Sequence, residues 1–506
     1  MGPRAAASSD SVSRVRAGTY GFFFLAFVAL VFVSHAAFFD FPYYWDEAGF
    51  YIPAAWDLHE HGSLIPTSTT PNAHPPGLRL WLAGVWKLTG SSIMATRAAM
   101  LLWASAGLLL TFMLAIRVCA GLPGAPAFGP VVLLAASPLY FMQSALAQPE
   151  VPAMVCGLAA LLAFLRGWFA VSALACVALV LCKETGVVFP LVLGYFAWRQ
   201  QRRWTPVAWF ALPMLVLAAW LGFLWTKTGH PFGDAAFSEY NAAYNLHPAR
   251  FAVALSRRFY TLLIENFHWL GLMALGHAWW KRRFFVASPW PLLAALTAGH
   301  VLMVSAFGGA VLERYLVPVL PLFYVAVAAS WSLFSARARW MHQGAMTAGL
   351  LAGLWWNPPY PFPFENNLAA RDQALLFRQA AGLVDALRGE RVLATAWPLS
   401  AALRDPRLGY VARRHDVREV ANFRPDVVRA SQIRPFEVFI LYTREWDPAG
   451  NWLRFGWVER AWRWIYGYRA QMTVEECSAW LGVPPWVTYE QRGQRLDVFV
   501  TRTRIQ

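Results

Sequence analysis

Charged residues are scarce in this chain of 506 residues. Asp, Glu, Lys and Arg make up 14% of the sequence, against roughly 25% in an ordinary soluble domain. Hydrophobic residues make up 58% and aromatic residues 16%, so a soluble core of this size would leave too little polar surface to cover it. The composition therefore argues against a soluble globular protein and indicates an integral membrane protein.

Cysteine patterns and nucleotide-binding motifs are also lacking. The five cysteines are scattered, mostly in or beside apolar runs, and show neither a disulfide framework nor metal-ligand spacing. The basic loops contain nothing that resembles a glycine-rich phosphate loop or a nucleotide fold. The lack of a nucleotide-binding motif in these loops argues against an ATP-driven pump.

The net charge of +15 suggests nucleic-acid binding, but the positions of the basic residues argue against a nucleic-acid partner. Many of them occupy three short loops between apolar runs. These are Arg199, Arg202 and Arg203, then Lys281, Arg282 and Arg283, and then Arg337 and Arg339. Because Lys and Arg in short loops stay on the cytoplasmic side of a membrane, the three loops set the orientation of the chain.

Apolar runs close to the roughly 17 to 25 residues that cross a bilayer recur along the first 356 positions. With the basic loops in the cytoplasm, they predict an α-helical polytopic membrane protein with about eleven transmembrane helices. The expected helices lie near residues 19–39, 96–117, 125–143, 151–166, 168–183, 184–198, 205–226, 260–279, 286–306, 314–333 and 341–356.

The first apolar run follows a basic leader with Arg4, Arg14 and Arg16, which is also typical of a secretory signal peptide. The run is longer than a signal core, and aromatic residues replace the small residues of a cleavage site. We therefore expect the run to be retained as a transmembrane helix with its amino end in the cytoplasm. The predicted location of the protein is the inner membrane.

Residues 77–90 carry Arg79 and Lys87 among apolar residues, which favours an amphipathic helix at the membrane interface over a further span. That choice keeps Arg117 and Arg166 in the cytoplasm with the other basic loops. The segments predicted on the extracytoplasmic side are then 40–95, the turns near 148–150 and 182–185, the loop 227–258, a turn near 307–313 and everything after about 357.

A proline-rich stretch that opens at Asn357 marks a predicted boundary between a transmembrane domain, 1–356, and a small soluble α/β domain, 357–506. Periodicity predicts a helix over about 368–388 and strands at 391–396, 436–442 and 496–501. Thr473 and Glu476 have the spacing of a capping box before a helix that Gly482 could end.

The first outer loop, 40–95, holds adjacent acids, Asp46 and Glu47, among aromatic residues. A carboxylate near apolar rings binds protons more tightly, which suits a general base. The alternative for an isolated acidic pair is a solvated loop or a helix cap.

Other ionisable residues are predicted on the same side of the membrane. Glu150 begins one span, Lys183 and Glu184 form a turn between two others, and Arg314 lies at the outer mouth of a further span. An exposed turn pair is the alternative for Lys183 and Glu184. For Arg314, as for Arg97, phosphate binding and simple snorkelling toward headgroups are both open.

Together these residues resemble the GT-C membrane glycosyltransferases, in the branch of protein O-mannosyltransferases and lipid A aminoarabinose transferases. The resemblance rests on an ordered series of motifs over nearly the whole membrane part. They are the Asp46-Glu47 pair, the His74-Pro75-Pro76 motif after it, Arg97, Glu150, the Lys183-Glu184 turn, the Arg314-Tyr315-Leu316 segment with its prolines, and the soluble C-terminal segment.

The resemblance implies transfer of a sugar, with inversion, from a polyprenyl-phosphate donor to a lipid, glycan or protein acceptor on the extracytoplasmic side. It makes Asp46 the base with Glu47 in support, and Glu150 the second acid. It assigns the donor phosphate and substrate to His74, Arg97, Lys183, Glu184, Arg314 and Tyr315. A divalent cation stays open, because Glu150 stands where relatives often have Asp and the first loop has no Asp-x-Asp metal motif.

Two other classes of protein fit parts of the pattern. Buried acids and basic mouths also mark the substrate pathway of a transporter or lipid flippase, although obvious inverted repeats are missing from the sequence. A non-catalytic envelope assembly protein would not need so many spans. We take the glycosyltransferase as the leading hypothesis and the transporter as the alternative.

Overall fold

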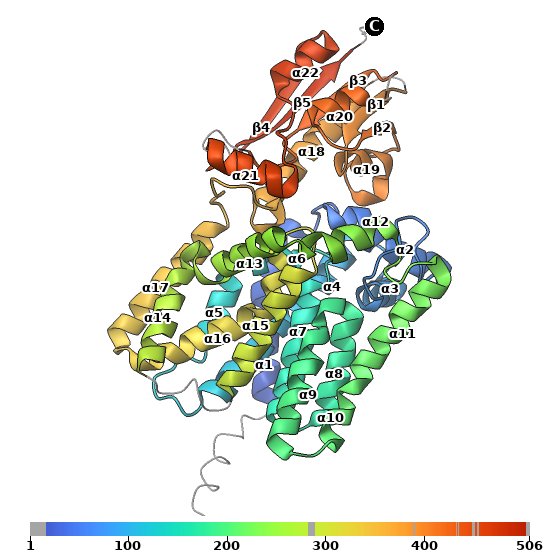
Figure 1. Ribbon diagram of the computed structural model, residues 1–506. Coiled ribbons are helices and arrows are strands. Elements are labelled where there is room, and N and C mark those ends of the chain that lie inside the picture. Colours follow the sequence, from blue (N-terminus) through green and yellow to red (C-terminus); the bar gives the residue numbers. More distant parts are fainter. Residues whose placement is uncertain are drawn as a thin grey trace, which may run out of the picture.

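The computed structural model describes residues 17–281, 289–387, 390–431, 433, 435–447, 451–452 and 455–501. The basic residues Arg4, Arg14, Arg16, Arg282 and Arg283, on which part of the orientation argument depends, lie outside the described residues. In Figure 1 the helices up to α17 form one large body, and a smaller region with a β-sheet sits on one end of it.

The large body consists of helices that overlap the predicted apolar ranges, together with α2, α3, α12 and most of α13, which lie in the predicted outer segments. They are α1 (Ala17–Ser34), α2 (Ile52–His61), α3 (Gly77–Thr89), α4 (Ile93–Cys119), α5 (Gly129–Ala136), α6 (Pro138–Ala145), α7 (Glu150–Leu165), α8 (Phe169–Cys182), α9 (Val188–Gln201), α10 (Thr205–Trp209), α11 (Ala211–Thr228), α12 (Ala235–Ser238), α13 (Pro248–Leu263), α14 (His268–Trp280), α15 (Trp290–Ala306), α16 (Leu320–Ser330) and α17 (Ala336–Gly353).

Within the described residues, three helical stretches are long and apolar enough to cross a membrane, namely 93–119, 205–228 and 313–333. A fourth results if α6 and α7, which meet at 108°, are counted as one span. These stretches indicate a membrane protein, whereas the predicted number of eleven spans stays a prediction.

Two predicted spans have boundaries that the structure corrects. The range 125–143 is split between α5 and α6, because Pro138 cannot continue a helix from the preceding residues. The range 260–279 is interrupted at Asn266 and Phe267, whose backbones are left-handed with φ of 51° and 68°, so α14 begins only at His268.

Helix α3 confirms a helix at the predicted interfacial segment, and it packs unusually close to α8. A Cβ atom on Gly77 would lie 2.5 Å from the carbonyl oxygen of Leu181. Only glycine therefore allows this approach, which brings the preceding His74 motif beside the turn that holds Lys183.

The C-terminal region contains a five-stranded sheet in the order β2-β1-β3-β5-β4. Strand β1 pairs in parallel with β2 and β3, and β5 pairs antiparallel with β3 and β4. The strands are β1 (Val392–Ala396), β2 (Asp416–Val420), β3 (Val438–Tyr442), β4 (Val487–Gln491) and β5 (Gln494–Val500), and the helices are α18 (Ala369–Ala386), α19 (Leu399–Arg404), α20 (Pro425–Ala430), α21 (Gly456–Tyr466) and α22 (Val474–Leu481).

Most predicted elements of this region are confirmed, namely α18, β1, β3, β5 and the capping box of α22 with Gly482 as its C-cap. The sequence analysis missed β2 and β4. Both are edge strands with exposed polar side chains at several positions, and their sequences lack the apolar run of a buried strand.

Direct contacts hold the C-terminal region against the first loop. The Tyr43 amide donates to the carbonyl of Leu408 at 3.0 Å, and the Tyr44 hydroxyl donates to Gln373 Oε1 at 2.6 Å. The ring of Trp397 lies against Gly49, where an added Cβ would come within 3.0 Å of it. The C-terminal region thus helps to position the loop that carries Asp46.

Candidate active site

Asp46 and Glu47 follow one another in the sequence, but their side chains point to different partners. Trp45 turns the chain with a left-handed backbone, φ 50°, and Asp46 is then the N-cap of the π-helix Glu47–Tyr51. Asp46 is 19% exposed and forms an ion pair with Arg314, whereas Glu47 is fully buried against Arg97.

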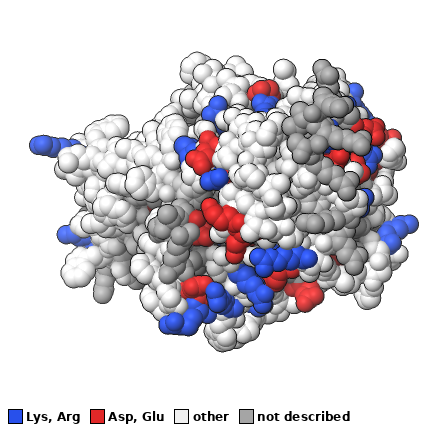
Figure 2. Space-filling view, turned by 90° about the horizontal axis from the view of Figure 1, so that it is seen from above, with Lys and Arg blue, Asp and Glu red and all other residues white. Residues whose placement is uncertain are grey.

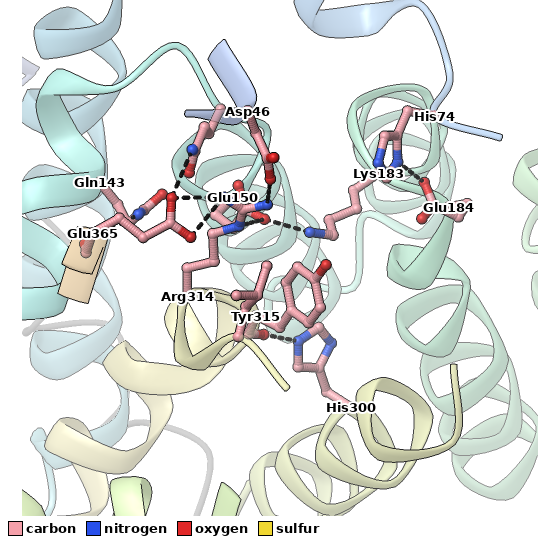
Figure 3. A network of polar contacts seen from close by, with 12 residues as sticks. Asp46, His74, Gln143, Glu150, Lys183, Glu184, His300, Arg314, Tyr315 and Glu365 are labelled. Carbon is pink, nitrogen blue, oxygen red and sulfur yellow. Dashed lines mark hydrogen bonds and ion pairs between the residues drawn. The ribbon is translucent and has the colours of Figure 1, made fainter. Parts of the chain in front are cut away.

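Arg314 is the centre of the polar network in Figure 3. Its guanidinium pairs with Asp46, with both oxygens of Glu365 at 2.7 and 2.8 Å, and through Nε with Glu150 at 3.3 Å. Gln148 donates to Glu365 at 3.0 Å. Three carboxylates from separate parts of the chain therefore share one guanidinium, itself 2% exposed.

Lys183 completes the cluster from the turn after α8. Its Nζ donates to Glu150 Oε1 at 2.5 Å and lies 4.1 Å from the centre of the Tyr315 ring. The backbone carbonyl of Tyr315 lies 2.7 Å from Nε2 of His300. The predicted residues Asp46, Glu150, Lys183, Arg314 and Tyr315 thus lie within one network.

His74 and Glu184 form a second pair at the edge of this network (Figure 3). Nδ1 of His74 lies 3.0 Å from Glu184 Oε2. Burial alone would raise the pKa of Glu184, but the neighbouring His74 and Lys183 outweigh it and lower the pKa to about 2. Glu184 therefore stays ionised and orients the His74 ring.

Glu47 and Arg97 form a pair that is saturated by protein contacts. Glu47 accepts from Arg97 at 2.5 and 3.1 Å and from the amides of Tyr44 and Ala147 at 3.0 and 2.5 Å. Arg97 also donates to the carbonyls of Phe41, Pro42 and Ala145. Both side chains have 0% exposure, and these contacts favour a supporting role for the pair.

Three cavities adjoin one another around the network. The central cavity, about 660 Å³, is lined by Asp46, Tyr51, His74, Arg314 and Tyr315, together with Trp397 and Arg444 of the C-terminal region. The apolar cavity, about 230 Å³, is lined by Leu217, Leu221, Met303 and Phe307 and also by Lys183 and Glu184. The aromatic cavity, about 370 Å³, is lined by Tyr240, Tyr244, Trp462, Tyr466, Arg444 and others.

The sequence analysis missed Glu365 and Arg258. Glu365 comes from the linker after α17, a segment whose prolines predicted only a boundary. Arg258 is fully buried on α13 and stacks over Tyr315 at 5.3 Å. It donates through Nη1 to the Leu312 carbonyl, while its Nε and Nη2 have no partner among the described residues.

Burial shifts the pKa of both missed residues. Burial raises the pKa of Glu365 to about 7, although Arg314 opposes the shift, and burial lowers the pKa of Arg258 to about 10. No group of three or more His, Cys, Asp or Glu side chains in the described part of the chain is arranged to hold a metal ion. The positive charge between the carboxylates of Asp46, Glu150 and Glu365 is the guanidinium of Arg314.

Comparison with known proteins places the fold in a class of mostly helical membrane proteins with a small sheet region at one end. No family model and no curated protein matches the sequence. Among solved structures, the chain shares its fold with ArnT from Cupriavidus metallidurans, both bound to undecaprenyl phosphate and in the apo state. The TM-scores are 0.54 and 0.51 at 12% identity, over 97% and 96% of this chain and 99% of each ArnT chain. The resemblance stated from the sequence is thus confirmed at the level of the fold.

The buried Glu47–Arg97 pair predicts a large loss of stability on removal of one partner. An Arg97→Met variant leaves Glu47 buried and unpaired, which costs about 3–5 kcal/mol. The unfolding temperature of the purified protein in detergent measures this loss. Arg378→Met, which breaks the exposed pair with Asp40, is the control and should cost no more than about 1 kcal/mol. Equal unfolding temperatures of the two variants would contradict the assignment.

The raised pKa of Glu365 predicts a pH-dependent difference between the wild type and Glu365→Gln. A carboxyl whose pKa is higher in the folded than in the unfolded chain binds its proton more tightly when folded. The stabilisation that the protonated Glu365 carboxyl gives the folded protein is complete below the unfolded pKa and is lost as pH rises through about 7. The unfolding temperature of Glu365→Gln minus that of the wild type should therefore increase from about pH 5 to about pH 8. A difference that does not change with pH would refute the raised pKa.

Proposed function

We propose that this protein transfers a sugar from a polyprenyl-phosphate donor to an acceptor hydroxyl on the extracytoplasmic side of the inner membrane. The observation that carries the proposal is the sequence of cavities around Asp46. An apolar compartment with Lys183 in its lining adjoins a central compartment lined by Asp46 and Arg314, and these compartments match a lipid chain with its phosphate and the reacting sugar.

The apolar cavity suits the lipid part of the donor. Leu217, Leu221, Met303 and Phe307 offer an apolar lining. Lys183 supplies a cation beside Tyr315, which lines both the apolar and the central cavity. An isoprenoid chain would bury its surface there while its phosphate reaches the cation. The ArnT structure that shares this fold binds undecaprenyl phosphate, which supports the choice of donor lipid.

The cations around Tyr315 suit the donor phosphate. Lys183 and Arg314 already have carboxylate partners, whereas Arg258 has none recorded among the described residues. A buried cation is costly unless an anion pairs with it. We therefore assign Arg258 with Lys183 to the phosphate, where they would stabilise the charge that develops as the phosphate leaves.

Asp46 is the best placed base. It lines the central cavity and is 19% exposed, whereas Glu47 and Glu150 have 0% exposure. Its carboxylate is the one of the three around Arg314 that a substrate in the central cavity can reach. Arg314 holds Asp46 in place, and Glu47 with Arg97 fixes the backbone beside it.

The reaction is a single displacement with inversion. The acceptor oxygen forms a bond to the anomeric carbon while the bond from that carbon to the phosphate oxygen breaks. The acceptor proton passes to Asp46, and polyprenyl phosphate leaves with the electron pair. The protein has to supply only orientation, the base and stabilisation of charge, because the donor carries its own leaving group.

The same proposal includes the topology. Eleven spans with a cytoplasmic amino end would place the first loop, the turn at Lys183 and the region after 357 on the extracytoplasmic side. The chain would divide into a membrane domain, 1–356, and an outer domain, 357–506. Lipid, glycan and protein acceptors all fit this topology.

Substitution of the base tests the function. Asp46→Asn should lower transfer at least about 100-fold, because Asn keeps the shape but does not accept the proton. Mass spectrometry of envelope glycolipids and glycoproteins from a complemented deletion strain measures the transfer. Asp40→Asn, in the same loop with a 79% exposed side chain, is the control. Undiminished transfer by a well-expressed Asp46→Asn variant would refute the assignment.

Substitution of Arg258 tests the donor site. Arg258→Met should weaken binding of undecaprenyl phosphate about 10-fold to 100-fold, as expected for a lost hydrogen bond to a charged group. The unfolding temperature of the lipid-free protein should stay the same or rise, since an unpaired buried charge is removed. The affinity of each variant for undecaprenyl phosphate is measured in detergent. Arg250→Met, on the same helix, is the control. A drop in stability at unchanged affinity would give Arg258 a structural role instead.

A further inference from the structure

The aromatic cavity has no part in the donor site or in the reaction as proposed. It lies between α13, the segment before Arg314, the proline-rich linker and the C-terminal region, which contributes Arg444, Trp462, Tyr466 and Gln471. It shares Tyr240, Ala310, Leu312 and Arg444 with the central cavity. The apolar cavity borders the central cavity elsewhere, through His74, Phe237, Asn241 and Tyr315.

A row of four aromatic rings leads through the aromatic cavity. The ring centres of Tyr240 and Tyr244 are 5.5 Å apart, those of Tyr244 and Tyr466 are 6.4 Å apart, and those of Tyr466 and Trp462 are 5.0 Å apart. Tyr240 also lines the central cavity. The row therefore extends from the reacting groups to helix α21 of the C-terminal region.

Polar atoms that no described residue satisfies accompany these rings. The Tyr466 hydroxyl is buried and has no hydrogen-bond partner among the described residues. Arg444 donates through Nε to the Trp397 carbonyl at 3.0 Å, and no hydrogen bond of its Nη atoms to a described residue is found. Buried hydroxyl groups are normally satisfied, so these donors are available to a bound molecule.

We propose that the aromatic cavity binds a sugar ring of the acceptor, so that the acceptor is a saccharide-bearing molecule. The inference rests on the proposed function. A pyranose has an apolar C–H face that packs on aromatic rings and hydroxyl groups at its rim that hydrogen-bond to neighbours. Trp462 and Tyr466 provide the rings, and Arg444 with the Tyr466 hydroxyl provides the polar contacts.

The other occupants explain fewer of the observations. An acyl chain would leave Arg444, Glu445 and Gln471 of the lining against hydrocarbon, which is unfavourable. On the face seen from above in Figure 2, basic and acidic side chains are intermixed, so surface charge there does not select a polyanion. The geometry also fits the displacement, because an acceptor entering past Tyr240 and Arg444 reaches the central cavity at another border than the donor lipid.

Binding of defined oligosaccharides to the purified full-length protein tests the inference. On an array of bacterial and synthetic oligosaccharides, the wild type should bind at least one member, and Trp462→Ala should weaken that binding about tenfold or more. Trp457→Ala is the matched control, since Trp457 lies on the same helix α21 but is 71% exposed and does not line the cavity. Absence of binding by the wild type, or equal binding by the two variants, would overturn the proposal.

A second variant separates recognition from folding. Tyr466→Phe removes only the unpartnered hydroxyl, so the unfolding temperature should stay the same or rise while oligosaccharide affinity falls severalfold. Affinity unchanged in Tyr466→Phe would overturn the assigned contact.

The outcome for the proposed function is read separately, from undecaprenyl phosphate binding and sugar transfer. Retained lipid binding and transfer without oligosaccharide binding would overturn only the acceptor assignment. Oligosaccharide binding without sugar transfer would refute the proposed function. The aromatic cavity would then still be a saccharide-binding site.

Discussion

The structure depends on one buried guanidinium. Arg314 holds Asp46 of the first loop, Glu150 at the start of α7 and Glu365 of the linker that leads to the sheet region. Charges away from water are costly unless they are paired, and loss of one partner is costlier than the pair itself. The same contacts therefore fix three distant segments and assemble the carboxylates around the central cavity, so fold and site share one constraint.

Much of this arrangement could be predicted from the sequence, because apolar runs and basic loops constrain which side of a membrane each polar residue faces. Asp46, Glu150, Lys183 and Arg314, which were predicted on one side of the membrane, lie within one network in the structure. The sequence could not separate Asp46 from Glu47, since two adjacent acids have the same local pattern. Their different partners come with the left-handed turn at Trp45, whose ring packs against Trp397 far along the chain.

Residues whose role depends on long-range packing were beyond prediction. Glu365 stands in a proline-rich linker, and only the docking of that linker brings it to Arg314. Arg258 follows another arginine, Arg257, on an amphipathic helix. Arg257 pairs with Glu313, whereas Arg258 has no carboxylate partner in the part of the chain that the structure describes. The sequence pattern treats the two alike, and only their burial against different neighbours distinguishes them.

The way the C-terminal region contributes to the site limits how its role can be tested. Trp397 and Arg444 line the central cavity, and Glu365 lies beyond the predicted boundary at 357. A truncation at Asn357 would remove Glu365, leave Arg314 with fewer carboxylates and free the first loop from Leu408 and Gln373. Loss of activity in such a truncation would not separate an effect on acceptor recognition from collapse of the Arg314 network. Single substitutions on α21, which lies outside the Arg314 network, leave that network intact and are the sound way to separate the two.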